Sequence, residues 1–194
     1  MSSPDAHVSR RPRADAARNR EKLVDAARSA FTTAGEDASL EAVARSAGVG
    51  IGTLYRNFPT REDLVAAVYA VELDAVLGTV DGFLAEFPAD RALRAFADRY
   101  AGFVQTKRGM AETVRVGAIR GAAETVHTRE RVNAAVQRFL DAGVADRTLR
   151  TDVVADDVTA ALIGVLLSTR DTIDPAQTGR LLDIVVDGLR LHDR

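Results

Sequence analysis

The sequence of 194 residues contains no cysteine, and aromatic residues make up only 5% of it. The absence of cysteine excludes disulfide bonds and thiolate metal sites, and it fits a reducing compartment. No apolar run approaches the roughly 20 residues that a membrane-spanning helix needs. Residues 1–13 also lack the apolar stretch of a secretory signal. We therefore expect a cytoplasmic protein that does not associate with a membrane.

The chain also lacks the residue groupings on which most enzymes depend. There is no cysteine nucleophile, no glycine-rich phosphate loop before a helix and no cluster of metal-ligand residues at ligand spacing. We therefore predict no enzymatic activity, no cofactor and no bound metal. Hydrophobic residues nevertheless make up 46% of the chain, which is enough to bury a core in one large domain or two small ones.

The net charge of −2 hides an uneven distribution of charge. Residues 1–61 carry ten basic and seven acidic side chains, whereas the remaining residues carry sixteen and twenty-one. Residues 9–22 alone contain six basic and two acidic side chains. A basic arm on an otherwise acidic chain is typical of proteins that bind nucleic acid phosphates. The alternative is a solvated tail, and residues 1–13 are predicted to form a flexible arm in either case.

Apolar periodicity predicts an all-α protein of about nine helices. The first helix spans about residues 14–34 and ends at Gly35. Two short helices follow, and Pro59 then separates the second of them from a long helix over residues 61–85. The other helices are predicted at residues 90–106, 109–125, 128–146, 155–169 and 175–191.

The two short helices, within residues 39–58, carry the main functional signal. Ser39 is a suitable N-cap for the first of them, and a tight turn containing Gly48 and Gly50 joins it to the second. The small side chain of Ala44 permits a close crossing of the two helices. This spacing is typical of a helix-turn-helix whose second helix enters the DNA major groove. The alternative interpretation is an ordinary helical hairpin with a polar exposed face.

The second helix of this pair carries polar groups suited to DNA. Arginine can form two hydrogen bonds with guanine, and asparagine can do so with adenine. Glycines at the start of the helix let its backbone approach a phosphate closely. Flanking arginines can neutralise phosphate charge. The predicted DNA-binding residues are Arg18, Arg20, Ser39, Arg45, Gly50, Gly52, Thr53, Tyr55, Arg56, Asn57 and Arg61.

Residues 52–64, Gly-Thr-Leu-Tyr-Arg-Asn-Phe-Pro-Thr-Arg-Glu-Asp-Leu, resemble the signature of the tetracycline-repressor (TetR) family. The similarity extends over about Arg18 to Val68. It implies a homodimeric, all-helical transcriptional regulator. An N-terminal three-helix DNA-binding head would occupy residues 14–62, and a ligand-binding and dimerisation domain would occupy residues 63–194.

The resemblance also implies roles for single residues. Tyr55 would contact a phosphate, and Thr53 and Arg56 would face the groove. Arg61 would clamp the DNA backbone, while the helices that begin at Ser39 and Gly50 would offer their N-termini to phosphates. The chain departs from the family pattern at Asn57, where members often have histidine, so that contact is left open.

The second domain is expected to bind a small molecule in a pocket with apolar walls and a polar anchor. The alternative is that these residues only form a packed core, with Arg115 exposed or paired with Glu112. The predicted ligand-binding residues are Tyr100, Phe103, Met110, Val114, Arg115 and Phe139.

The last two predicted helices are apolar on more than one face. One face would meet the protomer's own core and the other a second copy, which predicts a four-helix interface around a twofold axis. The alternative is a helix buried entirely inside one protomer. The predicted interface residues are Val158, Leu162, Val165, Leu166, Leu181, Leu182, Val185 and Leu189.

The resemblance to the TetR family implies a repressor that a small-molecule effector releases from a near-palindromic, double-stranded DNA operator. A dimer explains the palindrome, because two heads about 34 Å apart read successive major-groove faces. An activator, a regulator without a ligand, and a sensor or interaction module without a DNA role remain alternatives.

Overall fold

The computed structural model describes residues 10–106, 122–169, 172–174 and 176–191. Within these ranges the regular elements are helices, and an isolated β-bridge joins Leu149 to Arg190. The predicted all-α fold is therefore confirmed. None of the described helices is both long and apolar enough to cross a membrane. The chain divides into two compact units between Ala70 and Val71.

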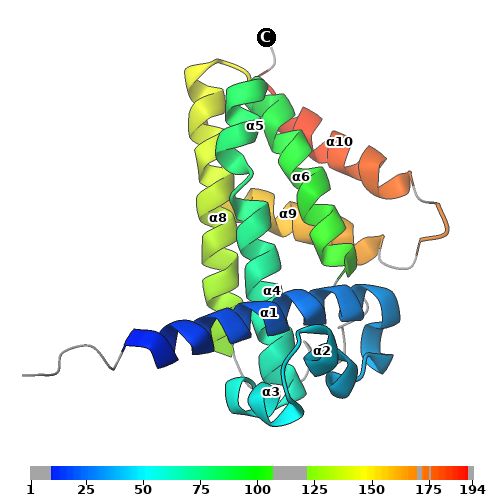
Figure 1. The fold of residues 1–194 in the computed structure, drawn as a ribbon. Coiled ribbons are helices and arrows are strands. Elements are labelled where there is room, and N and C mark those ends of the chain that lie inside the picture. Colours follow the sequence, from blue (N-terminus) through cyan, green and yellow to red (C-terminus); the bar gives the residue numbers. More distant parts are fainter. Residues whose placement is uncertain (1–9, 107–121, 170–171, 175, 192–194) are drawn as a thin grey trace, which may run out of the picture. The chain divides into compact units, whose positions relative to one another are not determined.

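The first unit is built from α1 and the helices that pack against it (Figure 1). Leu23, Ala27 and Phe31 repeat at four-residue spacing along α1 and are buried against α2 and α3. Gly35, with a φ of +57°, ends α1 as predicted. The elements are α1 (Arg10–Ala34), a short 3-10 turn η1 (Gly35–Asp37), α2 (Leu40–Ser46), α3 (Ile51–Asn57) and the first part of α4 (Arg61–Leu77).

Helix α1 begins at Arg10, inside the range that the sequence predicted as a flexible arm. Pro12 does not prevent this start, because the first turn of a helix needs no hydrogen bond from the proline nitrogen. Residues 10–13 are thus part of α1, which begins four residues earlier than the periodicity indicated.

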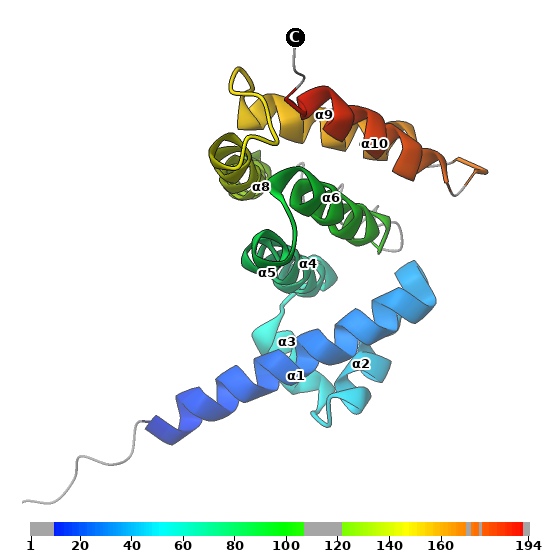
Figure 2. The same ribbon diagram turned by 90° about the horizontal axis from the view of Figure 1, so that it is seen from above.

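The second unit places α6 and α8 between α5 and the pair α9 and α10 (Figure 2). Helices α6, α9 and α10 begin and end within two residues of the predicted boundaries. Helix α8 begins six residues earlier than predicted, and residues 109–121 of the helix predicted at 109–125 lie outside the described residues. The elements are the last part of α4, α5 (Val80–Glu86), α6 (Ala89–Thr106), α8 (Ala122–Ala145), α9 (Ala155–Ser168) and α10 (Gln177–Leu189).

The single helix predicted over residues 61–85 is wrong, because the structure divides it into α4 and α5. The break lies at Gly78 and Thr79. Thr79 turns back on the chain, with its backbone N–H and its hydroxyl both donating to the carbonyl of Val76, at 3.1 and 2.6 Å. Glycine favours a helix interior less than most residues, and a threonine hydroxyl competes for backbone carbonyls.

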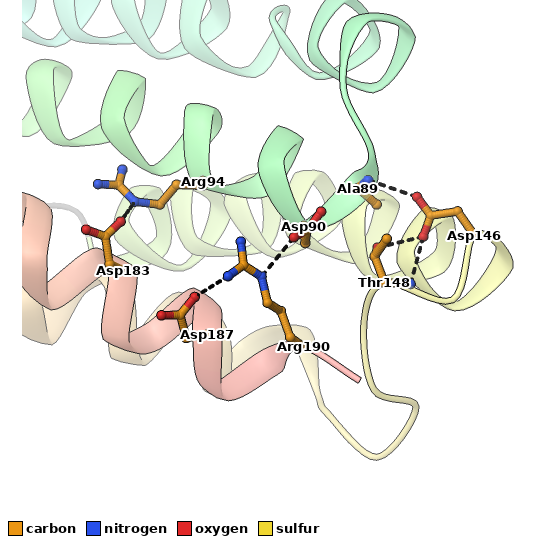
Figure 3. Close-up of polar contacts among 8 residues, drawn as sticks. All are labelled: Ala89, Asp90, Arg94, Asp146, Thr148, Asp183, Asp187 and Arg190. Atoms are coloured by element: carbon orange, nitrogen blue, oxygen red, sulfur yellow. Dashed lines mark hydrogen bonds and ion pairs between the residues drawn. The ribbon is translucent and has the colours of Figure 1, made fainter. Parts of the chain in front are cut away.

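Polar contacts hold α10 against α6 in the second unit (Figure 3). Arg94 Nε donates to Asp183 Oδ1 at 2.6 Å. Arg190 reaches both helices, since its Nε donates to Asp90 Oδ2 at 2.8 Å and its Nη1 to Asp187 Oδ1 at 2.5 Å. Because Asp90 lies in the first turn of α6, Arg190 ties the C-terminal end of α10 to the N-terminal end of α6.

Candidate nucleic-acid interface

Helix α2 begins at the N-cap that the sequence predicted. The hydroxyl oxygen of Ser39 accepts the backbone N–H of Ala42 at 3.3 Å, and the hydroxyl donates to Glu41 Oε2 at 2.7 Å. The hydrogen bond from Ser39 holds the pKa of Glu41 below its ordinary value. Both contacts stabilise the first turn of α2, where a carboxylate also favours the positive end of the helix dipole.

The turn between α2 and α3 depends on Gly48, whose φ is +69°. This left-handed conformation is accessible to glycine at little cost. The next residue, Val49, donates its backbone N–H to the carbonyl of Ala44 at 3.0 Å. Val43, Ala44 and Leu54 are buried, and Val49 is half-buried beside them, so the two helices share a small core.

Helix α3 buries only one of its residues, Leu54. Gly52, Tyr55 and Arg56 are exposed, and Thr53 is half-buried. Tyr55 has 47% of its surface exposed. The face opposite Leu54 therefore presents the polar and aromatic groups that the sequence assigned to DNA.

Two of the predicted base contacts are bonded within α3 itself. Arg56 Nε donates to the carbonyl of Gly52 at 3.0 Å, and Asn57 Nδ2 donates to the carbonyl of Thr53 at 2.8 Å. The Arg56 side chain is exposed, whereas Asn57 is half-buried. Arg56 therefore lies on the accessible surface of α3, and the Asn57 side chain lies along the helix.

Neither Gly50 nor Gly52 is required by packing inside the protein. Gly50 has an ordinary φ of −72°, and a Cβ atom built there would meet nothing within 4 Å. A Cβ atom at Gly52 would meet only the Arg56 side chain, at 3.9 Å. The absence of these side chains leaves the backbone at the start of α3 open to an approaching molecule.

The segment after α3 separates it from α4, as Pro59 in the sequence predicted. Phe58 is extended, with a φ of −139°, and Pro59 follows it. Thr60 and Asp63 then form a capping box at the start of α4. The Thr60 N–H donates to Asp63 Oδ2 at 3.0 Å, and the Asp63 N–H donates to Thr60 Oγ1 at 3.1 Å.

The arginines predicted to flank the DNA differ in their surroundings. Arg18 is exposed on α1 and pairs with Asp15, while Arg45 is exposed on α2. Arg20 is also exposed and Arg61 is half-buried, and both contact aromatic rings of their own unit. Arg20 lies over the Phe58 ring and Arg61 over the Phe31 ring. These two pairs were not predicted from the sequence.

The residues predicted to bind a ligand are only partly described. Met110, Val114 and Arg115 lie outside the described residues. Tyr100 and Phe103 on α6 and Phe139 on α8 are buried together with Phe96. The Phe96 ring centre lies 5.2 Å from that of Phe139 and 6.2 Å from that of Tyr100. These aromatic residues thus form part of the core of the second unit.

The predicted interface residues divide into two groups. Val158, Leu162 and Leu166 on α9 and Leu182 on α10 are buried inside the protomer. These four side chains therefore leave little surface on the protomer. Four others remain half-buried: Val165, Leu181, Val185 and Leu189.

The most exposed apolar side chains of these two helices are ones that the sequence analysis did not assign to an interface. Leu167 on α9 is 64% exposed, and Ile184 on α10 is 66% exposed. Periodicity alone could not choose Leu167, because α9 is apolar around much of its circumference, whereas Ile184 lies on the exposed face of the amphipathic α10.

Comparison with known proteins gives two matches to protein families. Residues 23–68 match the family "Bacterial regulatory proteins, tetR family", and residues 88–191 match the family "Transcriptional regulator SbtR-like, C-terminal domain". The second match covers more than half of the chain. The two matched segments fall on either side of the division between the two units.

Solved structures agree with both matches. The chain is 42% identical to the TetR transcriptional regulator SCO0520 from Streptomyces coelicolor, over 88% of this chain and 98% of that one, with a TM-score of 0.73. It is 28% identical to a TetR regulator from Mycobacterium vanbaalenii, over 92% and 99% of the two chains, with a TM-score of 0.67.

Curated relatives match over a shorter range. An HTH-type transcriptional regulator of Staphylococcus aureus is 38% identical over 63 residues, which is 32% of this chain and 34% of that protein. The chain thus matches about a third of the length of these curated relatives.

Proposed function

This chain belongs to the TetR family of transcriptional regulators, and we propose that it acts as a homodimeric repressor that a small-molecule effector releases from a near-palindromic DNA operator. The family is non-enzymatic, and its N-terminal domain binds DNA. The observation that carries the proposal is the exposed face of α3, where Tyr55 and Arg56 stand beside two glycines that internal packing does not require.

Sequence-selective DNA binding is supported by the chemistry of that face. An exposed arginine can form two hydrogen bonds with a guanine edge, and a tyrosine hydroxyl can bond a phosphate. Glycines at the start of α3 permit close approach of the backbone. Arg18 and Arg45 add exposed positive charge on α1 and α2, which favours association with a polyanion.

Dimerisation is supported by the surface of α9 and α10. Ala160, Gly164 and Leu167 form an exposed stripe of small and apolar residues along α9, and α10 exposes Ile184 and Gly188. A helix that buries one face in its own protomer and exposes another apolar face can bury the second against a copy of itself. We assign this surface to a second copy of the chain.

Effector binding is supported by polar groups where α8 and α9 meet in the second unit, some at the surface and others buried. Arg129 and Asn133 on α8 both bond Asp156 on α9, at 2.7 and 2.8 Å. One turn further along α9, the hydroxyl of Thr159 is buried without a hydrogen-bond partner among the described residues, as is Asn133 Oδ1. Buried polar atoms of this kind favour a polar ligand group. The effector would shift the equilibrium by its different affinities for the two conformations.

The proposal is tested by fluorescence anisotropy with DNA selected from a random library by the wild-type protein. Arg56→Ala and Tyr55→Ala should each weaken binding to the selected duplex by about 1–3 kcal/mol without lowering thermal stability. Arg91→Ala removes one exposed positive charge from α6 in the second unit and serves as the matched control.

Two results would contradict the proposal. One is the recovery of no preferred sequence from the library. The other is wild-type affinity in both α3 variants, which would move the DNA-binding surface away from α3. A thermal-shift screen of small molecules, followed by anisotropy with each hit, then tests the effector, because a hit must lower affinity for the selected duplex.

A further inference from the structure

The guanidinium of Arg20 joins α1 to the end of α3. Its Nη1 donates to the backbone carbonyl of Asn57, the last residue of α3, at 3.1 Å. Its central carbon lies 4.2 Å from the centre of the Phe58 ring, within the range of a cation–π contact. Phe58 is itself 1% exposed, so the ring that receives Arg20 belongs to the core of the first unit.

The same pair of contacts recurs at Arg61. Its Nη1 donates to the carbonyl of Ala38 at 2.6 Å, and its guanidinium lies 5.1 Å from the centre of the Phe31 ring. Ala38 immediately precedes Ser39, the N-cap of α2. Arg61 therefore binds the residue before the N-cap of α2, and Arg20 binds the last residue of α3.

We propose that Arg20 and Arg61 are positioning residues of the helix-turn-helix, which act on DNA through α2 and α3 instead of contacting phosphates themselves. This inference rests on the proposed DNA-binding function and deepens it. The positioning role differs from the expectation from the sequence, which was that both arginines bind DNA directly.

The short length of α2 and α3 makes them depend on such contacts. Helices α2 and α3 have seven residues each, which is too short for stability on their own, so tertiary contacts set their orientation. A positive charge near the C-terminal carbonyls of α3 also complements the helix dipole. A DNA-binding surface that is correctly oriented only part of the time loses affinity in proportion to that fraction.

The test compares Arg20→Met and Arg20→Lys with Arg45→Met, in which the replaced arginine is exposed on α2 and predicted to contact phosphate. Dissociation constants are measured for the selected duplex and a scrambled duplex over a range of salt concentrations. Arg20→Met should weaken the selected duplex about tenfold. The scrambled duplex and the salt dependence should change little.

A phosphate contact gives a different result. Arg45→Met should weaken both duplexes alike and reduce the slope of log K against log salt by about 0.9. Lysine retains the charge but not the planar fork of arginine, so Arg20→Lys should restore only part of the lost affinity. The proposal is overturned if Arg20→Met behaves like Arg45→Met and Arg20→Lys restores binding fully.

Hydrogen exchange of the DNA-free protein separates this inference from the proposed function. Arg20→Met should accelerate exchange at the amides of α3, including the Phe58 N–H that donates to the Leu54 carbonyl at 2.8 Å. Unchanged exchange in α3 would overturn the positioning role. If the wild-type protein fails to discriminate between the duplexes, the proposed function fails, and exchange in α3 still decides whether Arg20 holds the helix.

Discussion

Gly143 lies where α8 leaves room for the buried side chain of Leu149. Its carbonyl accepts the N–H groups of Thr148 and Leu149, at 2.9 and 3.1 Å, as the chain turns back at the end of the helix. Arg147 completes the turn with a φ of +61°, which is unusual for a residue with a side chain. A Cβ atom at Gly143 would overlap the Leu149 side chain.

Gly143→Ala should therefore lower the free energy of unfolding by about 1–3 kcal/mol, because either Leu149 or the turn must move. Gly82→Ala is the matched control, since it adds the same methyl group to α5 where nothing lies within 4 Å. That substitution should raise stability by up to about 1 kcal/mol. Urea denaturation of both variants checks the prediction, and equal midpoints would contradict it.

At the scale of elements, α8 and α9 are joined by the ion pair between Arg129 and Asp156. Arg129 donates to both carboxylate oxygens, from Nε at 2.7 Å and from Nη2 at 2.9 Å. This hydrogen bonding, followed by that from Asn133, lowers the pKa of Asp156 to about 2. A carboxyl whose pKa is lower in the folded state stabilises the fold above the unfolded pKa, and this contribution is lost as the pH falls.

The contribution of Asp156 should accordingly disappear between pH 3.8 and about 2. Arg129→Met should raise the pKa of Asp156 toward its ordinary value and weaken the pH dependence of stability in this window. NMR titration of the carboxyl carbon measures the shift. Asp152 is an internal control, because Arg150 lowers its pKa to about 2 and Arg129→Met should not change it.

The titration has a clear contrary outcome. If the midpoint of Asp156 is the same in wild type and Arg129→Met, the pair does not form in solution. A parallel change at Asp152 would show instead that the variant alters the whole second unit.

At the scale of the whole molecule, a charge introduced at one of two nearby positions of α10 distinguishes an effect on dimer assembly from an effect on folding. Ile184 is 66% exposed, whereas Leu182, two residues earlier, is 1% exposed. If the exposed surface of α9 and α10 joins two copies, a charge at Ile184 becomes buried in the assembly and unpaired. The same charge at Leu182 is buried in the protomer, whether or not a dimer forms.

Ile184→Glu should therefore dissociate the dimer into folded monomers of about 20.8 kDa, because an unpaired buried charge costs about 3 kcal/mol or more. Light scattering measures the mass, and circular dichroism checks the helix content. Leu182→Glu should unfold the chain. Val144→Glu, at an exposed apolar position on α8, should leave a folded dimer. A folded dimer of Ile184→Glu would place the interface elsewhere.

Features that depend on neighbouring residues were predictable from the sequence. Gly35 and Gly48 end helices as expected, Ser39 caps α2, and Thr60 and Asp63 form the capping box of α4. The helix-turn-helix itself also follows from local spacing. Hydrogen bonds of this kind span three or four residues, so residue type and order suffice to predict them.

Only the tertiary structure decided what distant residues do to one another. Arg20 meets Asn57 across 37 positions and Arg61 meets Ala38 across 23, and local spacing in the sequence predicted neither contact. The exposed faces of α9 and α10 were likewise decided by packing against α6 and α8. The physical reason is the same for the arginine contacts and for the exposed faces of the two helices. A periodic apolar pattern or an arginine specifies what a residue can contact, and the fold specifies which partner lies within reach.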